Sequence, residues 1–205
     1  MNILISAALN RELDPIRRTL DSVFDNTTNS LSIIKIPKGM NTATSDFSNF
    51  LKKKRPDLCI NTGTAGALSD DLRLFDLFFP TELVNKEGEI IPCGENPDTV
   101  SLKFPHWKSG RLYTSDKAVE SSAEKVSLLT EYRAQAVDME AIKVARLCRA
   151  AGVPCLALKV ISDTADEQTK ITFKRNLDRA IEILCEQMVN LIKGLLTKGD
   201  LVNIG

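Results

Sequence analysis

Short apolar runs alternate with amphipathic segments along the chain. Residues 3–9 and 155–161 are almost uninterrupted apolar runs, which are typical of strands buried on both faces of a sheet. Residues 172–197 instead repeat apolar positions at helical spacing, from Phe173 to Leu195, and this pattern predicts a long amphipathic helix. Because strands of the first kind alternate with helices of the second, the pattern predicts an α/β fold.

Weaker signals place the remaining elements. A helix is expected after the first strand, with Leu13, Ile16 and Leu20 on one face. The small residues of segment 62–66 (Thr-Gly-Thr-Ala-Gly) predict a turn directly after a buried strand. Further strands are expected over residues 32–37, 58–61 and 110–114. Residues 75–104 form a strand-like stretch with turn signals at 86–88 and 94–97. Further helices are expected over residues 41–54, 121–133 and 138–151, and Gly152 ends the last of them. No repeat, low-complexity stretch or linker interrupts this order, so we expect a single domain over residues 1–205.

The charge balance narrows the range of partners. The 205 residues include 27 Lys and Arg and 27 Asp and Glu, which gives a formal net charge of zero. This balance removes the main argument for a nucleic-acid or anionic-membrane partner. The first residues lack the basic segment of a signal peptide, and no apolar stretch reaches the roughly 18 residues of a membrane span. We therefore expect a cytoplasmic protein that binds neither nucleic acid nor membrane.

Histidine and cysteine usage argues against several kinds of site. His106 is the single histidine, which excludes a metal centre built on several histidines, and any Ser-His-Asp or Cys-His arrangement would depend on it. The five cysteines are odd in number and show no C-x-x-C spacing. They are expected to be reduced core residues and to form neither a disulfide framework nor a zinc site, so no metal is predicted.

Carboxylates stand at or just beyond the ends of three predicted strands. Glu12 follows the first strand, Glu140 follows the short run 136–137, and Asp163 follows the run 155–161. Because ligands of α/β sheets bind beyond the carboxyl ends of the strands, these side chains are expected to converge on one pocket as candidates for general acid and base. Lys159, inside an otherwise apolar strand, needs a carboxylate or a substrate to face.

Each of these features has a simpler interpretation when it is taken alone. Glu12 fits a solvated residue in the first turn of a helix, and segment 63–66 fits a tight strand-to-helix connection as well as a ligand loop. Asp138 and the pair Ser162-Asp163 fit caps of a helix or a turn. It is their combination in one chain that favours a binding site.

Four segments follow one another in a recognisable order. The chain opens with Ile5-Ser6-Ala7-Ala8-Leu9 and Glu12, continues with Asn61-Thr62-Gly63-Thr64-Ala65-Gly66, and later carries Ala136-Val137-Asp138-Met139-Glu140-Ala141 upstream of Val160-Ile161-Ser162-Asp163-Thr164-Ala165-Asp166. This order resembles the nucleoside phosphorylase/nucleosidase superfamily, and the spacing is most similar to 5′-methylthioadenosine/S-adenosylhomocysteine nucleosidases and futalosine hydrolases. The resemblance covers essentially the whole chain. It implies a three-layer α/β/α fold with a central mixed twisted sheet.

The resemblance also implies a reaction and a set of residues. It implies that water cleaves the N-glycosidic bond of an adenine nucleoside through a transition state like a ribosyl cation, without a cofactor and in a homodimer. In its terms Asp163 is the acid that protonates the purine, Glu12 is the base for the water, and Glu140 binds the ribose hydroxyls. The other implied residues bind the base, the ribose or the water, or support those that do: Thr64, Ala65, Gly66, Ala118, Val119, Asp138, Met139, Lys159, Ser162 and Phe173.

The departures from the family pattern leave the 5′ substituent open. Ala118 replaces an aromatic residue that is frequent in the family, and Lys159 stands where nucleosidases usually carry arginine. Residues 80–108, which help to shape the 5′ subsite, are shorter than in typical methylthioadenosine nucleosidases. The substrates left open are methylthioadenosine and S-adenosylhomocysteine, in methionine salvage, and aminodeoxyfutalosine, for which the alternative is a futalosine hydrolase dedicated to menaquinone biosynthesis.

Other functions fit the sequence less well. A purine nucleoside phosphorylase needs a cationic phosphate cradle, but the segments at Gly39 and Gly63 carry no arginine, and only Lys38 lies beside the first. A non-catalytic nucleoside-binding protein is expected to have lost one of the carboxylates, all of which are present. A dinucleotide-binding protein needs the G-x-G-x-x-G fingerprint, which segment 61–66 does not match.

Overall fold

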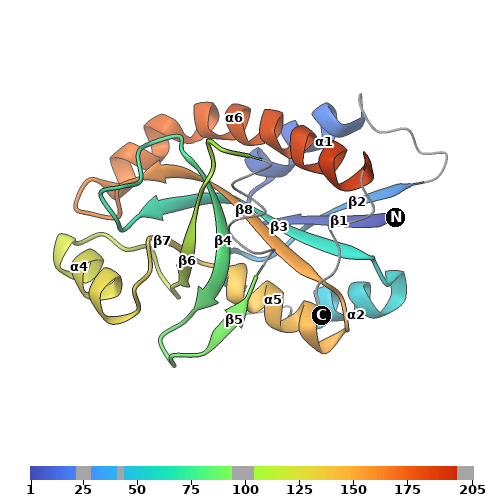
Figure 1. Ribbon diagram of the computed structural model, residues 1–205, viewed down its shortest axis with the longest axis horizontal. Coiled ribbons are helices and arrows are strands. Elements are labelled where there is room, and N and C mark those ends of the chain that lie inside the picture. Colours follow the sequence, from blue (N-terminus) through green and yellow to red (C-terminus); the bar gives the residue numbers. More distant parts are fainter. Residues whose placement is uncertain (22–28, 41–43, 94–103, 198–205) are drawn as a thin grey trace.

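A mixed sheet forms the centre of the fold in the computed structural model, which describes residues 1–21, 29–40, 44–93 and 104–197 (Figure 1). Its eight strands are β1 (Asn2–Ala7), β2 (Ser30–Lys35), β3 (Leu58–Ala67), β4 (Leu77–Val84), β5 (Ile90–Pro92), β6 (Lys108–Thr114), β7 (Ala136–Asp138) and β8 (Cys155–Asp163). The strand order is β2-β1-β3-β7-β6-β4-β5, and β8 pairs with both β3 and β4. The predicted α/β fold with a central mixed sheet is confirmed.

Five of these strands close into a ring of pairings. β3 pairs in parallel with β8, β8 runs antiparallel to β4, β4 and β6 are parallel, and β7 joins β6 in parallel and β3 antiparallel. The last contact is short and involves only Gly66 and Ala67 of β3. The ring therefore closes at the carboxyl end of β3, and this brings the ends of β3, β7 and β8 together.

Helices cover the two faces of the sheet (Figure 1). On one face lie α1 (Asn10–Asp21) and α6 (Thr169–Thr197), and on the other lie α2 (Thr44–Lys54) and α5 (Ala141–Ala150). The alternation of side chains along β1 explains how both layers are held, because Ile3 and Ile5 pack with residues of α1 and α6 whereas Leu4 packs with residues of α2 and α5. This arrangement accounts for the continuous apolar run at the start of the chain.

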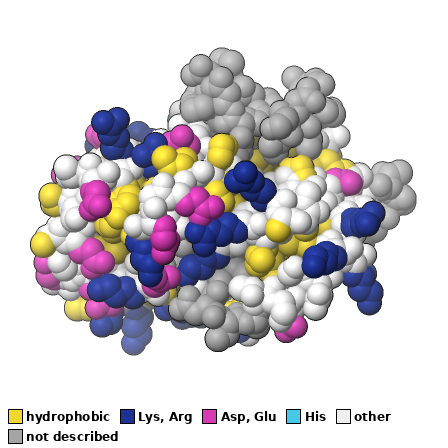
Figure 2. All heavy atoms as spheres, turned by 90° about the horizontal axis from the view of Figure 1, so that it is seen from below, with side chains coloured by type: hydrophobic (Ala, Val, Ile, Leu, Met, Phe, Trp, Pro, Cys, Tyr) yellow, Lys and Arg dark blue, Asp and Glu magenta, His cyan; other side chains and the backbone are white. Residues whose placement is uncertain are grey.

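Two further helical elements belong to the described residues. α4 (Ser122–Glu131) begins after Ser121, whose hydroxyl accepts a hydrogen bond from the backbone N–H of Glu124 at 3.2 Å. The short 3-10 helix η1 (Lys38–Met40) follows β2 and includes Gly39 at φ 68°. No helix in the described part of the chain is both long and apolar enough to cross a membrane. On the face shown in Figure 2, basic and acidic side chains are interspersed, as the balanced composition suggests.

At the site, the boundaries of two predicted elements are wrong. Segment 62–66 is not a turn: β3 runs through it to Ala67, because its backbone continues to pair with β8. The helix predicted from residue 138 begins at Ala141, and Asp138 is instead the last residue of β7. Its carboxylate accepts a hydrogen bond from the Ala141 N–H at 2.9 Å, so it caps the helix from the strand that precedes it.

Other predicted boundaries differ from the structure by a few residues. The long C-terminal helix begins at Thr169, three residues before its predicted start at residue 172. Residues 41–43 of one predicted helix and the turn signal at 94–97 lie outside the described residues. All five cysteines have free thiols. The sulfur atoms of Cys59, Cys148 and Cys155 lie within 4.8 Å of one another, a proximity that their spacing in the sequence does not reveal.

Candidate active site

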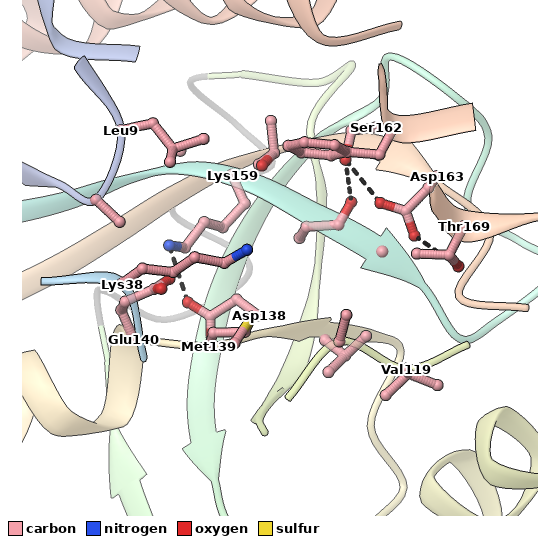
Figure 3. A pocket seen from close by; sticks show the side chains of 18 of the residues that line it. Leu9, Lys38, Val119, Asp138, Met139, Glu140, Lys159, Ser162, Asp163 and Thr169 are labelled. Atoms are coloured by element: carbon pink, nitrogen blue, oxygen red, sulfur yellow. Dashed lines mark hydrogen bonds and ion pairs between the residues drawn. The ribbon is translucent and has the colours of Figure 1, made fainter. Parts of the chain in front are cut away.

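A pocket of about 290 Å³ opens where β3, β7 and β8 end (Figure 3). Its volume is at the small end of the range for sites that bind small molecules. Every residue that the sequence singled out for catalysis or substrate binding lines it: Glu12, Thr64, Ala65, Gly66, Ala118, Val119, Asp138, Met139, Glu140, Lys159, Ser162, Asp163 and Phe173. The structure therefore brings these residues together, and their individual roles stay predictions.

Glu12 is a buried carboxylate and not a solvated residue of a first helical turn. Its side chain reaches from α1 to β3, where Oε1 accepts hydrogen bonds from the Thr64 N–H at 3.2 Å and the Thr64 hydroxyl at 3.4 Å. The Leu9 N–H donates to Oε2 at 3.0 Å. Burial raises the pKa of Glu12 above its usual value, although these hydrogen bonds and the charge of Lys159 oppose the shift. A carboxyl group with a raised pKa that is held by fixed donors is suited to accept a proton.

Asp163 lies beside Ser162 and Thr169, at the end of the pocket away from Lys38 (Figure 3). The Ser162 hydroxyl donates to Oδ2 at 2.8 Å, and Oδ1 accepts from the Ala165 N–H at 3.1 Å and from the Thr169 hydroxyl at 3.4 Å. The Asn176 amide in turn holds the Ser162 carbonyl at 3.0 Å. Burial raises the pKa of Asp163, which favours the protonated form that a general acid needs.

A buried ion pair also lines the pocket. The Lys159 ammonium is 2.9 Å from Oδ2 of Asp138 and also donates to Oδ1 of Asn61 at 2.8 Å. The Thr114 hydroxyl donates to Oδ1 of Asp138 at 2.8 Å. Burial lowers the pKa of Lys159, but the charges of Asp138 and its neighbours outweigh that effect and raise it overall, so the amine stays charged. The predicted need of Lys159 for an acidic partner is met by Asp138.

Glu140 faces the pocket from the start of α5. It is partly buried, and Oε1 accepts a hydrogen bond from the Gly39 N–H at 2.8 Å. Burial, together with the charge of Asp138, raises the pKa of Glu140 to about 7, against the opposing charge of Lys159. Glu140 therefore changes its charge near neutral pH.

Two glycines give the carboxylates their space. A Cβ atom at Gly63, where φ is +136°, would lie 2.8 Å from Oε1 of Glu12. A Cβ atom at Gly66 would lie 2.7 Å from Oδ1 of Asp163. Both distances are shorter than any real Cβ contact, so larger residues at these positions would displace the carboxylates. These contacts give segment 62–66 a specific role as a strand that lets two acidic side chains approach its backbone.

Several lining residues were not predicted to form the site. Thr169 hydrogen-bonds Asp163 from the first turn of α6, and its only signal in the sequence is its position shortly after Asp163. Lys38 lines the pocket next to Gly39, although its place in the sequence indicated only a phosphate-binding residue of a phosphorylase. The remaining unpredicted lining residues come mostly from the rim and from the backbone next to predicted ones: Ala8, Leu9, Thr62, Gly63, Lys117, Glu120, Val137 and Lys170.

The pocket does not resemble a metal site. Among the residues that the structure describes, the trio Cys59, Cys148 and Cys155 is the group whose ligand atoms are close enough to share an ion, and it does not line the pocket. The carboxylates of the pocket instead bind backbone N–H groups, hydroxyls and the Lys159 ammonium. They are arranged for hydrogen bonding and proton transfer.

Comparison with known proteins finds similarity to nucleoside-cleaving enzymes. The family model of the phosphorylase superfamily matches residues 94–193. The aminodeoxyfutalosine nucleosidase of Helicobacter pylori is 29% identical over 155 residues, which span 65% of this chain and 67% of that protein. The 5′-methylthioadenosine/S-adenosylhomocysteine nucleosidase of Actinobacillus succinogenes is 24% identical over 197 residues, which span 84% of this chain and 86% of that protein.

Solved structures share the fold. The native futalosine hydrolase of Helicobacter pylori matches with a TM-score of 0.83 at 24% identity, over 95% of this chain and 98% of that chain. A Helicobacter pylori nucleosidase variant with 5′-methylthioadenosine in its active site matches with a TM-score of 0.84 at 23% identity, over 95% of this chain and 99% of that chain. The fold of this chain is therefore that of these nucleosidases.

Proposed function

We propose that this chain, which belongs to the phosphorylase superfamily, hydrolyses the N-glycosidic bond of 5′-substituted adenosines and releases adenine. The proposal rests on one observation above all: Glu12, Glu140 and Asp163 surround a single pocket, and burial raises the pKa of each. The relatives named above act as nucleosidases on adenosine derivatives, and this reaction needs both a proton donor and a proton acceptor.

In the proposed mechanism Asp163 and Glu12 act on opposite sides of the bond that breaks. Asp163 donates its proton to the purine ring, which makes adenine a better leaving group as the bond between N9 and the anomeric carbon breaks and its electron pair moves to the base. Glu12 takes a proton from a water molecule, whose oxygen forms the new bond to the anomeric carbon. The products are adenine and the 5-substituted ribose.

The other pocket residues bind and position the nucleoside. Glu140 accepts hydrogen bonds from the ribose hydroxyls and stabilises the positive charge that develops on the sugar. Met139 packs beneath the ribose, and Thr64 helps to orient the water through its contact with Glu12. Around the base we assign the backbone at Ala118 and Val119, the side chain of Phe173, and the space left by Ala65 and Gly66. Asp138 and Lys159 act through their ion pair, which orients β8, the strand that carries Ser162, and β7, the strand that leads into Glu140.

The relatives support a class of substrate and leave its members open. That class comprises 5′-methylthioadenosine, S-adenosylhomocysteine and aminodeoxyfutalosine, which share the adenine and ribose that the proposed residues bind. The corresponding pathways would be methionine salvage or menaquinone biosynthesis. We further propose a cytoplasmic homodimer, which light scattering of the purified protein tests directly: a mass of one chain at micromolar concentration would contradict the dimer.

Adenine release tests the function. The purified protein is incubated with each of the three nucleosides, with and without inorganic phosphate, and free adenine is separated by chromatography. Adenine released at the same rate with and without phosphate, together with a free reducing sugar, supports the hydrolase. Release only in the presence of phosphate, with a sugar 1-phosphate as co-product, would make the chain a phosphorylase. No adenine from any of the three nucleosides would contradict both activities for this class of substrate.

A further inference from the structure

Lys38 places a positive charge in the pocket that the proposed reaction does not use. It is exposed at the end of the pocket near Glu140, and Figure 3 shows its side chain extending from that end into the cavity. Within the described part of the chain, the other lysines that line the pocket each pair with a carboxylate: Lys159 with Asp138, Lys170 with Glu120 and Lys117 with Glu124. No such ion pair is present for Lys38 among the same residues.

The backbone next to Lys38 is tied to the site through both polar groups of one residue, Gly39. The Gly39 N–H donates to Oε1 of Glu140 at 2.8 Å, and the Gly39 carbonyl accepts from the Lys143 ammonium at 2.6 Å. Glu140 and Lys143 lie one turn apart at the start of α5. Lys38 therefore has a fixed attachment point beside Glu140, while its side chain keeps the freedom to reach a ligand.

The position of Lys38 corresponds to one part of a bound nucleoside. With the base at Asp163 and the ribose hydroxyls at Glu140, as the proposed function has them, the sugar lies toward the end of the pocket opposite Asp163, and its 5′ substituent leaves from C4′, beside the carbon that bears the 3′-hydroxyl. A 5′ substituent thus extends toward the end of the pocket opposite Asp163. Lys38 lies at that end (Figure 3).

We propose that Lys38 binds an anionic group on the 5′ substituent and so selects substrates whose 5′ chain carries a carboxylate. This inference rests on the proposed function and extends it to the substrate class. A lysine ammonium acts as a point charge with three donors, which suits the end of a flexible chain better than a planar arginine fork would. S-adenosylhomocysteine and aminodeoxyfutalosine carry such a carboxylate, whereas methylthioadenosine does not, so the first two are the preferred substrates.

A matched pair of substrates isolates the charge. The probes are 5′-deoxy-5′-(2-carboxyethylthio)adenosine and its carboxamide, which have nearly the same size and differ in charge. For the wild-type chain we expect kcat/KM for the acid to exceed that for the amide by about tenfold, the low end of the effect of one hydrogen bond to a charged group. Added salt reduces this ratio, because the contact is exposed.

Variants connect the preference to Lys38. Lys38→Met brings the acid-to-amide ratio close to one, and Lys38→Glu reverses the preference. Lys170→Met is the matched control, because Lys170 also lines the pocket but is paired with Glu120 at 2.8 Å and adjoins Thr169, at the end where Asp163 lies. We expect this variant to keep the wild-type ratio. Thermal unfolding of each variant checks that it is folded.

Three results would overturn the inference. The first is a wild-type ratio near one, and the second is a preference for the acid that Lys38→Met leaves intact. The third is phosphate-dependent adenine release that Lys38→Met abolishes, which would assign Lys38 to free phosphate. Failure of the inference stays distinct from failure of the proposed function: in the first two results both probes still release adenine, whereas a chain without nucleosidase activity releases it from neither.

Discussion

The Lys159 ammonium and the Asp138 carboxylate form an ion pair of 2.9 Å in which each side chain is only 1% exposed. The pair joins β8, one residue after Leu158 in the core, to the end of β7. It therefore connects the strand that carries Ser162 and Asp163 to the strand that leads into Glu140. Because both charges are withdrawn from water, removing one partner leaves the other uncompensated in the interior.

Lys159→Met is expected to lower the free energy of unfolding by about 3–5 kcal/mol, since it leaves Asp138 buried without its partner. Urea denaturation followed by circular dichroism measures this change. The double variant Asp138→Asn/Lys159→Met removes the uncompensated charge and should recover part of the loss. Lys170→Met, which breaks an exposed pair with Glu120, is the control and should change stability by roughly 0.5 kcal/mol or less. A loss below that of the control for Lys159→Met would show that the buried pair contributes nothing.

The ionisation of Glu140 should appear in the pH dependence of the reaction. Burial and the charge of Asp138 raise its pKa to about 7, so the carboxylate that the ribose hydroxyls need forms only as the pH rises through that value. We expect kcat/KM to increase from pH 6 to pH 8 and to level off above, and Glu140→Gln to be slow and to lose this dependence. An unchanged acid limb in Glu140→Gln would assign the limb to another group.

The raised pKa of Glu140 affects stability in the opposite direction: kcat/KM is expected to rise with pH, whereas the free energy of unfolding is expected to fall. The folded state binds the Glu140 proton more tightly than the unfolded state, whose pKa is near 4.5. Its contribution is fully present below pH 4.5 and is lost as the pH rises to about 7. Unfolding curves across this range should therefore show a fall in stability that is smaller in Glu140→Gln. A fall of equal size in both proteins would contradict the raised pKa.

Asp163→Asn should abolish most of the turnover and preserve nucleoside binding. The amide keeps the shape of the side chain and still accepts hydrogen bonds from Ser162 or Ala165, but it has no proton to give to the purine. Loss of a general acid typically costs about 10²–10⁴ in rate. Single-turnover adenine release measures the rate, and calorimetric titration measures binding. The control is Asp166→Asn, which lies in the same segment but outside the pocket lining, and its rate of adenine release should stay within a few-fold of wild type. Near-normal turnover by Asp163→Asn would refute the assignment of the acid.

The carboxylates of the pocket were accessible to sequence reasoning because the topology of a mixed sheet gathers the ends of its parallel strands. Glu12, Glu140 and Asp163 each follow an apolar run, so their convergence follows from local pattern and general architecture. Residues such as Ala118 and Met139 have no such pattern, and only the family resemblance singled them out. Their presence in the pocket lining therefore depended on knowledge of related chains.

What the sequence failed to predict depends on contacts between distant segments. Whether segment 62–66 turns or continues as a strand is decided by its pairing with β8, about a hundred residues later in the chain (Gly63 lies opposite Lys159). Lys38 enters the pocket because Gly39 is bound by Glu140 and Lys143, and neither contact leaves a periodic signal near residue 38. Local pattern therefore identifies the carboxylates that follow apolar runs, while the ends of the strands, their register and the attachment of connections have to come from the structure.

Gly66 offers a test of how closely the backbone of β3 must approach the acid. Its φ lies outside the left-handed region, so alanine is compatible with the backbone, but a Cβ atom would lie 2.7 Å from Oδ1 of Asp163 and 3.2 Å from the Cβ of Ala165. Since Ala165 is buried, the side chain of Asp163 has to move, and we expect Gly66→Ala to lower kcat by at least about tenfold, a loss consistent with a displaced catalytic group. Gly88→Ala is the control: φ is +73° there and nothing lies within 4 Å of an added Cβ, so it should cost stability through backbone strain and leave kcat unchanged. If Gly66→Ala retained the wild-type kcat while its crystal structure showed Asp163 displaced, the position of this carboxylate would not limit the reaction, and the proton donor would have to be sought elsewhere in the pocket.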